Sequence, residues 1–177
     1  MVQKAIPDRL KCRDRVVVWR AGCSSGEEAY SLLFLTAERG AGNGEGVLDK
    51  LVVFGTDLDE AALEIPTRRS WVGFFEPLGG GLHRVREEYR KRVFFLADNL
   101  AGAQSPFLPA SIDVCLCRNV LYYMTPEGRG KVLRKLARFL APGGYLLLGE
   151  TEVVGDHPEV GLRVANSEGV FVLKKGG

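Results

Sequence analysis

Five short apolar runs alternate with segments of helical periodicity along the chain. The runs are nearly continuous in hydrophobicity, which is typical of strands in a parallel sheet that is covered on both faces. They span residues 16–19, 51–55, 93–96, 112–117 and 145–149. Apolar positions recur at helical spacing over residues 27–39, which Gly40 ends, and again between the helix-start sequence Thr125-Pro126-Glu127 and residues 141–144. This alternation predicts a doubly wound α/β fold with a mostly parallel sheet.

Two further segments add to this picture. Near the end of the chain, two β-rich runs flank the turn sequence at residues 166–169, which predicts a hairpin and an antiparallel edge to the sheet. Residues 66–92 fit neither period, because Pro66 ends a short helix and three consecutive glycines follow at 79–81. This segment is either a plain long connection or a small β excursion or loop over a site.

Size and composition favour one soluble domain. The chain has 177 residues, of which 46% are hydrophobic, and a formal net charge of +2. That charge predicts no broad surface for nucleic acid. The four cysteines form no CxxC pair and there are only two histidines, so we expect no zinc or other metal site. Because no signal peptide or membrane-spanning run is present, we expect a reducing, cytoplasmic setting, although a fragment of a larger protein would look the same.

The turn between the first predicted strand and helix carries the first candidate chemistry. Nucleotide-binding folds usually hold phosphate there, but this turn places the carboxylates Glu27 and Glu28 at the helix start. Asp57 ends the next strand, where such folds place the acid that binds ribose hydroxyls. A ligand with a ribose and a positive charge but no phosphate fits this pair, and S-adenosylmethionine is such a ligand.

Ordinary structural roles compete with this interpretation. Ser24-x-x-Glu27 and Ser25-x-x-Glu28 both match a capping box, in which acids stabilise the helix start without binding a ligand. Asn99 and Asn119 follow two further strands, and either one alone favours a turn or a cap. In an open parallel sheet, however, ligands bind outside the carboxyl ends of the strands, and the polar residues meet at that edge.

Six stretches in order resemble the CheR-type chemoreceptor glutamate O-methyltransferases, across nearly the whole chain. They are AGCSSGEEAYSL, GTDLD, DNL, CRNVLYYM, APGGYLLLGETE and the closing hairpin. The resemblance implies a Rossmann-like class I methyltransferase domain over residues 1–177, with residues 66–92 as a reduced β-subdomain or loop insertion. It implies methyl transfer from S-adenosylmethionine to glutamate side chains in the helical cytoplasmic region of a chemoreceptor-like protein.

The resemblance also implies roles for individual residues. Ser25 and Glu27 would contact the amino-acid end of S-adenosylmethionine, and Asp57 its ribose. Four residues would line the rest of the cofactor site: Asn99, Leu100, Asn119 and Val120. Arg118 and Tyr123 would face the substrate glutamate, which is ionised at neutral pH and needs no general base. From the residues alone, Arg118 could equally form a plain salt bridge and Tyr123 could be part of the core.

The chain also departs from the family pattern. Family members usually carry an N-terminal helical domain, and we expect none within this sequence, because only the basic segment KAIPDRLKCRDR and its flanks precede the first strand. This departure keeps open a second hypothesis, a non-catalytic S-adenosylmethionine sensor or scaffold module in a signalling protein. A small-molecule methyltransferase or dehydrogenase on the same fold is a weaker alternative. A run of basic residues in the last helix favours a solvated face over a docking site for an acidic helix: Lys131, Arg134, Lys135 and Arg138.

Overall fold

The computed structural model describes residues 2–43, 46–58, 73–80, 82–149, 152, 155–165 and 172–176. Its helices are α1 (Val2–Leu10), α2 (Glu27–Asn43), α3 (Glu87–Arg90) and α4 (Pro126–Phe139), with short 3-10 turns at Leu48–Lys50, Leu121–Tyr123 and Pro158–Val160. Its strands are β1 (Val16–Ala21), β2 (Leu51–Asp57), β3 (Phe75–Gly79), β4 (Leu82–Val85), β5 (Val93–Ala97), β6 (Ile112–Cys117), β7 (Leu140–Leu148), β8 (Leu162–Val164) and β9 (Val172–Lys175).

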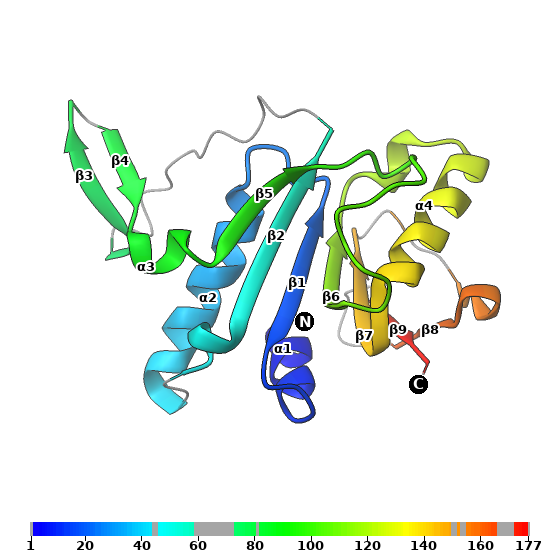
Figure 1. Cartoon of the computed structure of the whole chain (residues 1–177), viewed down its shortest axis with the longest axis horizontal. Coiled ribbons are helices and arrows are strands. Elements are labelled where there is room, and N and C mark those ends of the chain that lie inside the picture. The colour runs from blue at the N-terminus through cyan, green and yellow to red at the C-terminus, as the bar shows by residue number, and fades with distance from the viewer. Residues whose placement is uncertain are drawn as a thin grey trace.

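Seven strands form one sheet in the order β5-β2-β1-β6-β7-β9-β8 (Figure 1). The first five are parallel, whereas β9 pairs antiparallel with both β7 and β8. The predicted mostly parallel α/β sheet with an antiparallel C-terminal addition is therefore confirmed. The strand order reverses between β1 and β6, and open α/β sheets bind ligands at such a switch point.

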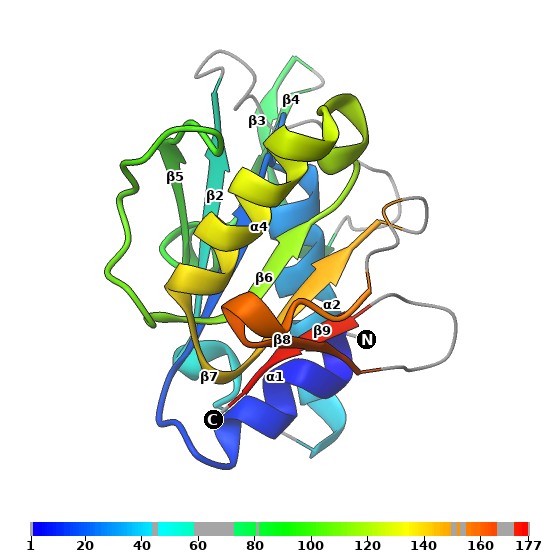
Figure 2. The same ribbon diagram turned by 90° about the vertical axis from the view of Figure 1, so that its right-hand side faces the viewer.

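Helices cover both faces of the sheet (Figures 1 and 2). One buried cluster joins α1 and α2 to the sheet, and a second joins α4 to the opposite face. The sequence of β1 is continuously apolar because both faces of the strand are buried. Val16 and Val18 belong to the first cluster, and Trp19 and Ala21 belong to the second. Residues on both sides of this strand lose contact with water, so no polar alternation is possible.

The N-terminal helix α1 was not predicted. It is only nine residues long and contains Pro7, which disfavours a helix when the sequence is considered alone. Tertiary contacts define it instead: Arg9 donates from Nε and Nη2 to Oδ1 of Asp113 at 3.0 and 2.8 Å, and both side chains are buried. The other Asp113 oxygen accepts the backbone N–H of Val17 at 2.9 Å. Asp113 thus joins α1, β1 and β6.

Strands β3 and β4 form a separate two-stranded hairpin, which extends from the body beyond the β5 edge (Figure 1). The β excursion expected in this region is therefore present, while residues 59–72, including Pro66 and Trp71, lie outside the described residues. The base of the hairpin is attached to α2 through Phe34, whose ring stacks on Phe74 with centroids 4.4 Å apart and meets Phe75 and Tyr89 edge-on.

Two predicted boundaries were wrong. Helix α2 continues through Gly40 to Asn43, because glycine near a helix end costs only about 1 kcal/mol relative to alanine. Strand β7 begins at Leu140, directly after α4, and a bulge over residues 141–144 precedes Tyr145, which pairs with Val114. The start of α4 is as expected, since Thr125 Oγ1 accepts the N–H of Gly128 at 3.2 Å. The turn at 166–169 lies outside the described residues.

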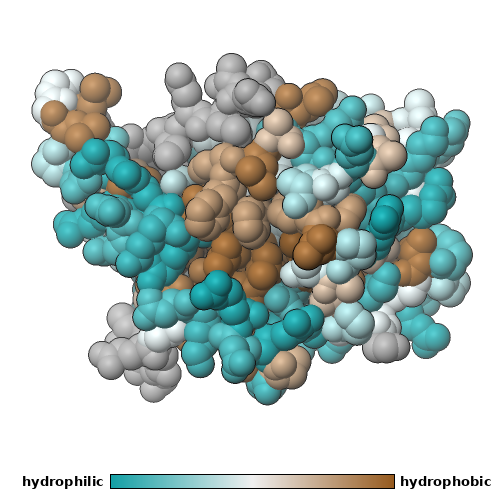
Figure 3. Space-filling model, viewed as in Figure 1, coloured by the Kyte–Doolittle hydropathy of each residue, from teal (hydrophilic) through white to brown (hydrophobic). Residues whose placement is uncertain are grey.

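Part of the α4-side face of the sheet is apolar surface. Figure 3 shows hydrophobic residues gathered in front of β2 and β5, beside α4. Phe94 of β5 is 45% exposed there, and its ring lies 5.5 Å from that of Phe54, which in turn meets Phe107 edge-on. None of the helices in the described ranges has the length and apolar character needed to cross a bilayer.

Asp113→Ala should cost about 3–5 kcal/mol of unfolding free energy, because it leaves the buried guanidinium of Arg9 without its carboxylate. Urea denaturation followed by circular dichroism measures this change. Glu127→Ala is the control, since it removes an exposed pair with Lys131 and should cost less than about 1 kcal/mol. Equal effects of the two substitutions would contradict the central role of Asp113.

Candidate functional site

The predicted site residues lie at one edge of the sheet because four parallel strands end there in register. Ala21 pairs with Thr56, Asp57 pairs with Ala97, and Arg20 pairs with Leu116 one position before the end of β6. The last strand residues and the segments that follow them carry all of the predicted site residues: Ser25, Glu27, Asp57, Asn99, Leu100, Arg118, Asn119, Val120 and Tyr123. The fold therefore brings them to a common edge around the switch point.

The turn after β1 is held against the end of β2. The backbone N–H of Ser24 donates to Oδ2 of Asp57 at 2.7 Å, with Ser24 itself in the left-handed region at φ +47°. Gly26 has φ +78°, and a Cβ there would lie 2.6 Å from the Phe95 ring. Both the backbone conformation and the close approach require glycine at this position. The turn thus presents backbone and Ser25 to the edge without bulky side chains.

Glu27 and Glu28 have different surroundings although they are adjacent. Glu28 Oε1 accepts from Nη1 of Arg118 at 2.6 Å, and its Oε2 accepts from Nε of Arg20. Glu28 is therefore used for two ion pairs, in contrast to the capping role considered from the sequence. The carboxylate of Glu27 has no hydrogen bond or ion pair to any other described residue. One acid is thus part of the scaffold and the other is available to a ligand.

Asn99 and Leu100 follow β5 in a loop that α4 holds in place. Asn99 Oδ1 accepts the N–H of Ala101 at 3.0 Å, so the local turn role considered for this residue is present. The side chain of Leu100 is buried in the core beneath the loop. A ligand at this position would therefore meet the Nδ2 group of Asn99 and the backbone of Leu100.

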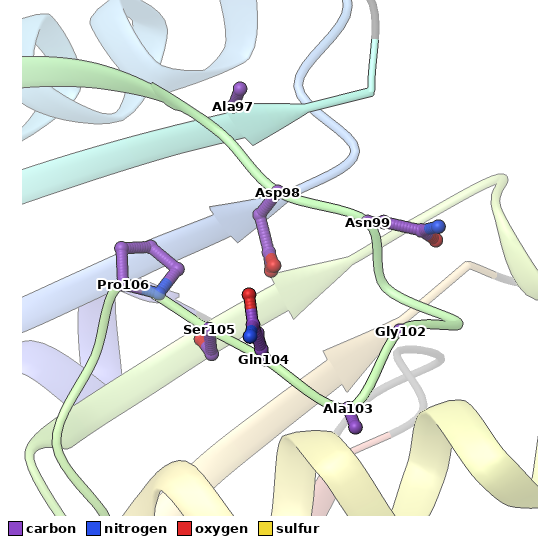
Figure 4. A pocket seen from close by; sticks show the side chains of 8 residues that line it. All are labelled: Ala97, Asp98, Asn99, Gly102, Ala103, Gln104, Ser105 and Pro106. Atoms are coloured by element: carbon purple, nitrogen blue, oxygen red, sulfur yellow. The ribbon is translucent and has the colours of Figure 1, made fainter.

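Lys135 fixes the same loop from α4. Its Nζ donates to Asp98 Oδ1 at 2.8 Å and to the carbonyls of Asn99 and Gln104, both at 2.7 Å. Lys135 is buried, so its assignment to a solvated basic face was wrong. A hollow of about 550 Å³ lies within the loop, and Figure 4 shows Asp98 and Gln104 pointing toward one another inside it while Asn99 points away. Asn99, which follows β5 at the strand-end edge, is nevertheless among the residues that line this hollow.

The segment after β6 has the second unusual backbone conformation. Asn119 has φ +59°, in the left-handed region that asparagine adopts more readily than most residues other than glycine. Across the edge, Gly22 has φ +69°, and a Cβ there would lie 2.5 Å from Cγ2 of Val120. The turns after β1 and β6 therefore pack directly against each other, on the two sides of the switch point.

Glu152 stabilises this conformation, and sequence reasoning did not assign it that role. Its Oε2 accepts the N–H groups of Asn119 and Gly149, both at 2.9 Å, and its Oε1 accepts those of Val120 at 2.7 Å and Tyr122 at 3.2 Å. Burial raises the pKa of the Glu152 carboxyl, but the four N–H hydrogen bonds outweigh burial and hold that pKa below its ordinary value. The sequence signals were an acid shortly after a predicted strand and its place at the end of the stretch APGGYLLLGETE, and neither indicates this role.

Arg118 and Tyr123 lie on the open side of this segment. Arg118 remains 44% exposed beside Glu28, so the salt bridge considered from the sequence is present. Tyr123 is 77% exposed, and its ring lies 4.3 Å from that of Tyr122, which is also exposed. The alternative that Tyr123 is a core residue is therefore wrong. The guanidinium of Arg118 thus lies partly exposed beside Glu28, and the two phenols that follow it in the chain are exposed to solvent.

The donor set suits a ligand that carries positive charge and hydroxyl groups. Carboxylates at positions 27 and 57 attract cations and accept hydrogen bonds from hydroxyls. A model of the family described as "CheR methyltransferase, SAM binding domain" matches residues 1–169. This chain belongs to the CheR methyltransferase family. The matched part is the S-adenosylmethionine-binding domain of that family, in agreement with the donor set.

Curated relatives agree with membership of the CheR family. A chemotaxis protein methyltransferase of Vibrio parahaemolyticus is 32% identical over 168 residues, which cover 86% of this chain and 59% of the relative. Chemotaxis protein methyltransferase 1 of Pseudomonas aeruginosa is 30% identical over 189 residues, covering 98% of this chain and 68% of the relative. The chain thus spans about three fifths to two thirds of the length of these relatives.

Solved structures show the same fold. A TehB-like S-adenosylmethionine-dependent methyltransferase from Corynebacterium glutamicum aligns with a TM-score of 0.56 at 17% identity and covers 98% of this chain and 87% of that one. The DszA carbon methyltransferase aligns with a TM-score of 0.63, also at 17% identity, over 97% of this chain and 51% of that one. The expected Rossmann-like methyltransferase fold is confirmed for this CheR-family domain.

Glu152→Gln should lower the unfolding free energy at neutral pH by at least about 2 kcal/mol, because an amide offers one acceptor oxygen where the carboxylate offers two. The pH dependence gives the sharper result. Since the folded-state pKa of Glu152 is lowered, its contribution is present above the unfolded-state pKa and is lost as the pH falls through the folded-state value. The unfolding free energy of the variant should therefore fall less between pH 6 and pH 3 than that of the unsubstituted protein. Parallel curves in urea titrations at several pH values would contradict this role.

Proposed function

We propose that this chain transfers a methyl group from S-adenosylmethionine to a glutamate side chain in the helical region of a chemoreceptor-like signalling protein, in the cytoplasm. The observation that carries the proposal is the exposed Arg118 guanidinium, held by Glu28 at the same sheet edge as Asp57 and Glu27. A cation for an acidic substrate and anions for a cationic methyl donor thus stand side by side.

Seven residues would hold the methyl donor. Glu27 and Ser25 would bind its amino-acid end at the start of α2, and Asp57 would bind the ribose hydroxyls from the end of β2. The adenosine would lie against Asn99 Nδ2 and the backbone of Leu100, with Asn119 and Val120 along the reacting end. This arrangement follows the strand-end positions and the family membership.

When bound, S-adenosylmethionine supplies a methyl group on a sulfonium, which a carboxylate oxygen takes as the carbon–sulfur bond breaks and its electron pair returns to sulfur. The chain itself contributes alignment. Arg118 can bind the substrate carboxylate through a charge-assisted hydrogen bond, and the hydroxyl of Tyr123 can orient it. A glutamate is already ionised at neutral pH, so no residue has to remove a proton.

The cysteine next to Arg118 is unsuited to accept the methyl group. Cys117 is buried, and burial raises the pKa of its thiol to about 12. A thiol at neutral pH is a weak nucleophile, because the reactive form is the thiolate. The exposed side chains at this edge therefore favour an external carboxylate as the acceptor.

Methylation of the substrate would act through charge. Each methyl ester removes one negative charge from the substrate helix, which changes the electrostatic repulsion within it and shifts its conformational equilibrium. The names of the curated relatives, chemotaxis protein methyltransferases, support this class of substrate.

A second candidate function is a non-catalytic S-adenosylmethionine-binding module. One observation favours it: an uncharacterised 104.1 kDa protein of Rhodobacter capsulatus is 33% identical over 153 residues, which cover 77% of this chain and only 15% of that protein. Domains of this kind therefore occur inside much larger proteins. The exposed Arg118 and Tyr123 favour catalysis instead, because a binding module has no use for a substrate-facing cation.

The first test is calorimetric titration of the chain with S-adenosylhomocysteine, followed by methyl transfer to a soluble helical chemoreceptor fragment. We expect micromolar binding in the unsubstituted protein and a loss of at least about ten-fold in affinity with Asp57→Ala. Asp57→Asn is the matched variant, because its amide oxygen still accepts the Ser24 N–H while its charge is gone. Binding without methyl transfer would favour the module, and no binding would contradict both functions.

A further inference from the structure

Three charged side chains form a linear cluster between the start of α2 and the end of β6. The carboxylate of Glu28 lies between Arg20 and Arg118, with one oxygen on each guanidinium. Arg20 is a strand residue whose side chain is only 9% exposed, whereas Arg118 is 44% exposed. The cluster therefore runs from the protein interior to the open edge of the site.

Arg20 is fixed on its inner side by the backbone. Its Nη1 donates to the carbonyl of Ala21 at 2.6 Å and to that of Leu116 at 3.4 Å, and its Nη2 donates to the carbonyl of Arg118 at 3.3 Å. These bonds join β1 to β6 directly across the switch point. Arg20 consequently holds Glu28 at a defined position, and Glu28 holds the tip of Arg118.

The cluster carries a net positive charge that one further anion can neutralise. Two guanidinium groups and one carboxylate give one net positive charge, and arginine does not lose its proton in proteins. Without Arg20, the pair of Glu28 and Arg118 would be neutral, and Glu28 would repel an approaching carboxylate. Only Nη1 of Arg118 is bonded to another described side chain, so its Nε and Nη2 groups are available to a ligand.

We propose that Glu28 is a positioning residue for the substrate, and that with Arg20 behind it this residue makes Arg118 a receptor for a single side-chain carboxylate. Glu27 serves the cationic methyl donor, and Glu28 serves the anionic methyl acceptor. Each of the two adjacent acids thus acts on a different substrate of the reaction. This inference rests on the proposed methyl transfer to glutamate and names how that site selects its acceptor.

The same charge balance favours release of the product. A glutamate carries one negative charge before the reaction and its methyl ester carries none. The cluster attracts the former and has no net electrostatic attraction for the latter. Arg118 therefore discriminates between acceptor and product by charge, while a bidentate contact fixes the orientation of the carboxylate.

The test compares Glu28→Gln with the matched variant Glu27→Gln. Both remove one charge from adjacent positions of the same helix turn. Glu28→Gln should raise the KM for a soluble helical chemoreceptor fragment by about ten-fold, since Arg118 loses its anchor, with S-adenosylhomocysteine affinity within two-fold of the starting value. Glu27→Gln should do the opposite, weakening S-adenosylhomocysteine by about ten-fold with little change in that KM.

A second readout follows Arg118 itself. In arginine-side-chain 15N spectra, rotation of the Arg118 guanidinium should be slow in the unsubstituted protein and in Glu27→Gln, and fast in Glu28→Gln. Unchanged rotation and unchanged KM in Glu28→Gln would overturn the proposal, as would a loss of S-adenosylhomocysteine affinity equal to that of Glu27→Gln. If Glu28→Gln does not fold, Glu28→Asp retains a charge beside Arg20 but is one methylene too short for Arg118, and it should give the same two changes.

These experiments test the proposed enzymatic function and the positioning role of Glu28 separately. If the unsubstituted protein binds S-adenosylhomocysteine but transfers no methyl group, the proposed enzymatic function fails, and titration of the receptor fragment against the Arg118 signal still decides the positioning role. A shift of that signal which disappears in Glu28→Gln supports it. A shift that persists in Glu28→Gln, or no shift at all, overturns it.

Discussion

The in-register ending of four parallel strands is the constraint on which the site depends. Strands β1, β2, β5 and β6 end within about one residue of each other, so the turns that follow them share one edge. A shift by one residue would move every side chain of a strand to the opposite face of the sheet, where it would have to pack against the other buried cluster. The hydrophobic core therefore fixes the relative heights of Ser25, Asp57, Asn99 and Asn119, although none of these residues is part of it.

Backbone and side chains then refine this edge in ways that a strand pattern does not contain. The turns after β1 and β6 both pass through the left-handed region, at Ser24 and Asn119. Each is held by a carboxylate, Asp57 accepting one N–H of the first turn and Glu152 accepting several N–H groups around the second. A carboxylate at such a place costs desolvation, and several N–H donors offset that cost. Charge-assisted hydrogen bonds thus stabilise both left-handed conformations.

Sequence reasoning predicted what repeats along the chain and missed what joins distant segments. The strands, the helices α2 and α4, the C-terminal hairpin and the strand-end residues follow from hydrophobic period and from order along the chain. Helix α1 could not be predicted in this way, because it is held by the ion pair of Arg9 with Asp113, which is 104 positions away in the sequence. Lys135 was placed on a solvated face because its spacing matches its exposed neighbours, yet Asp98 and two carbonyls draw it inward. The division of labour between Glu27 and Glu28 likewise needs Arg118, which is 90 positions away.

The dependence of α1 on Asp113 has a consequence for biosynthesis. During synthesis on a ribosome the first helix emerges long before its carboxylate partner, and the turn with Glu27 and Glu28 emerges long before Arg118. Glu152 comes later still, and without it the segment after β6 has no acceptor for its N–H groups. The nascent chain therefore cannot close this edge until β7 has left the exit tunnel, and the early segments remain open to chaperones throughout that interval.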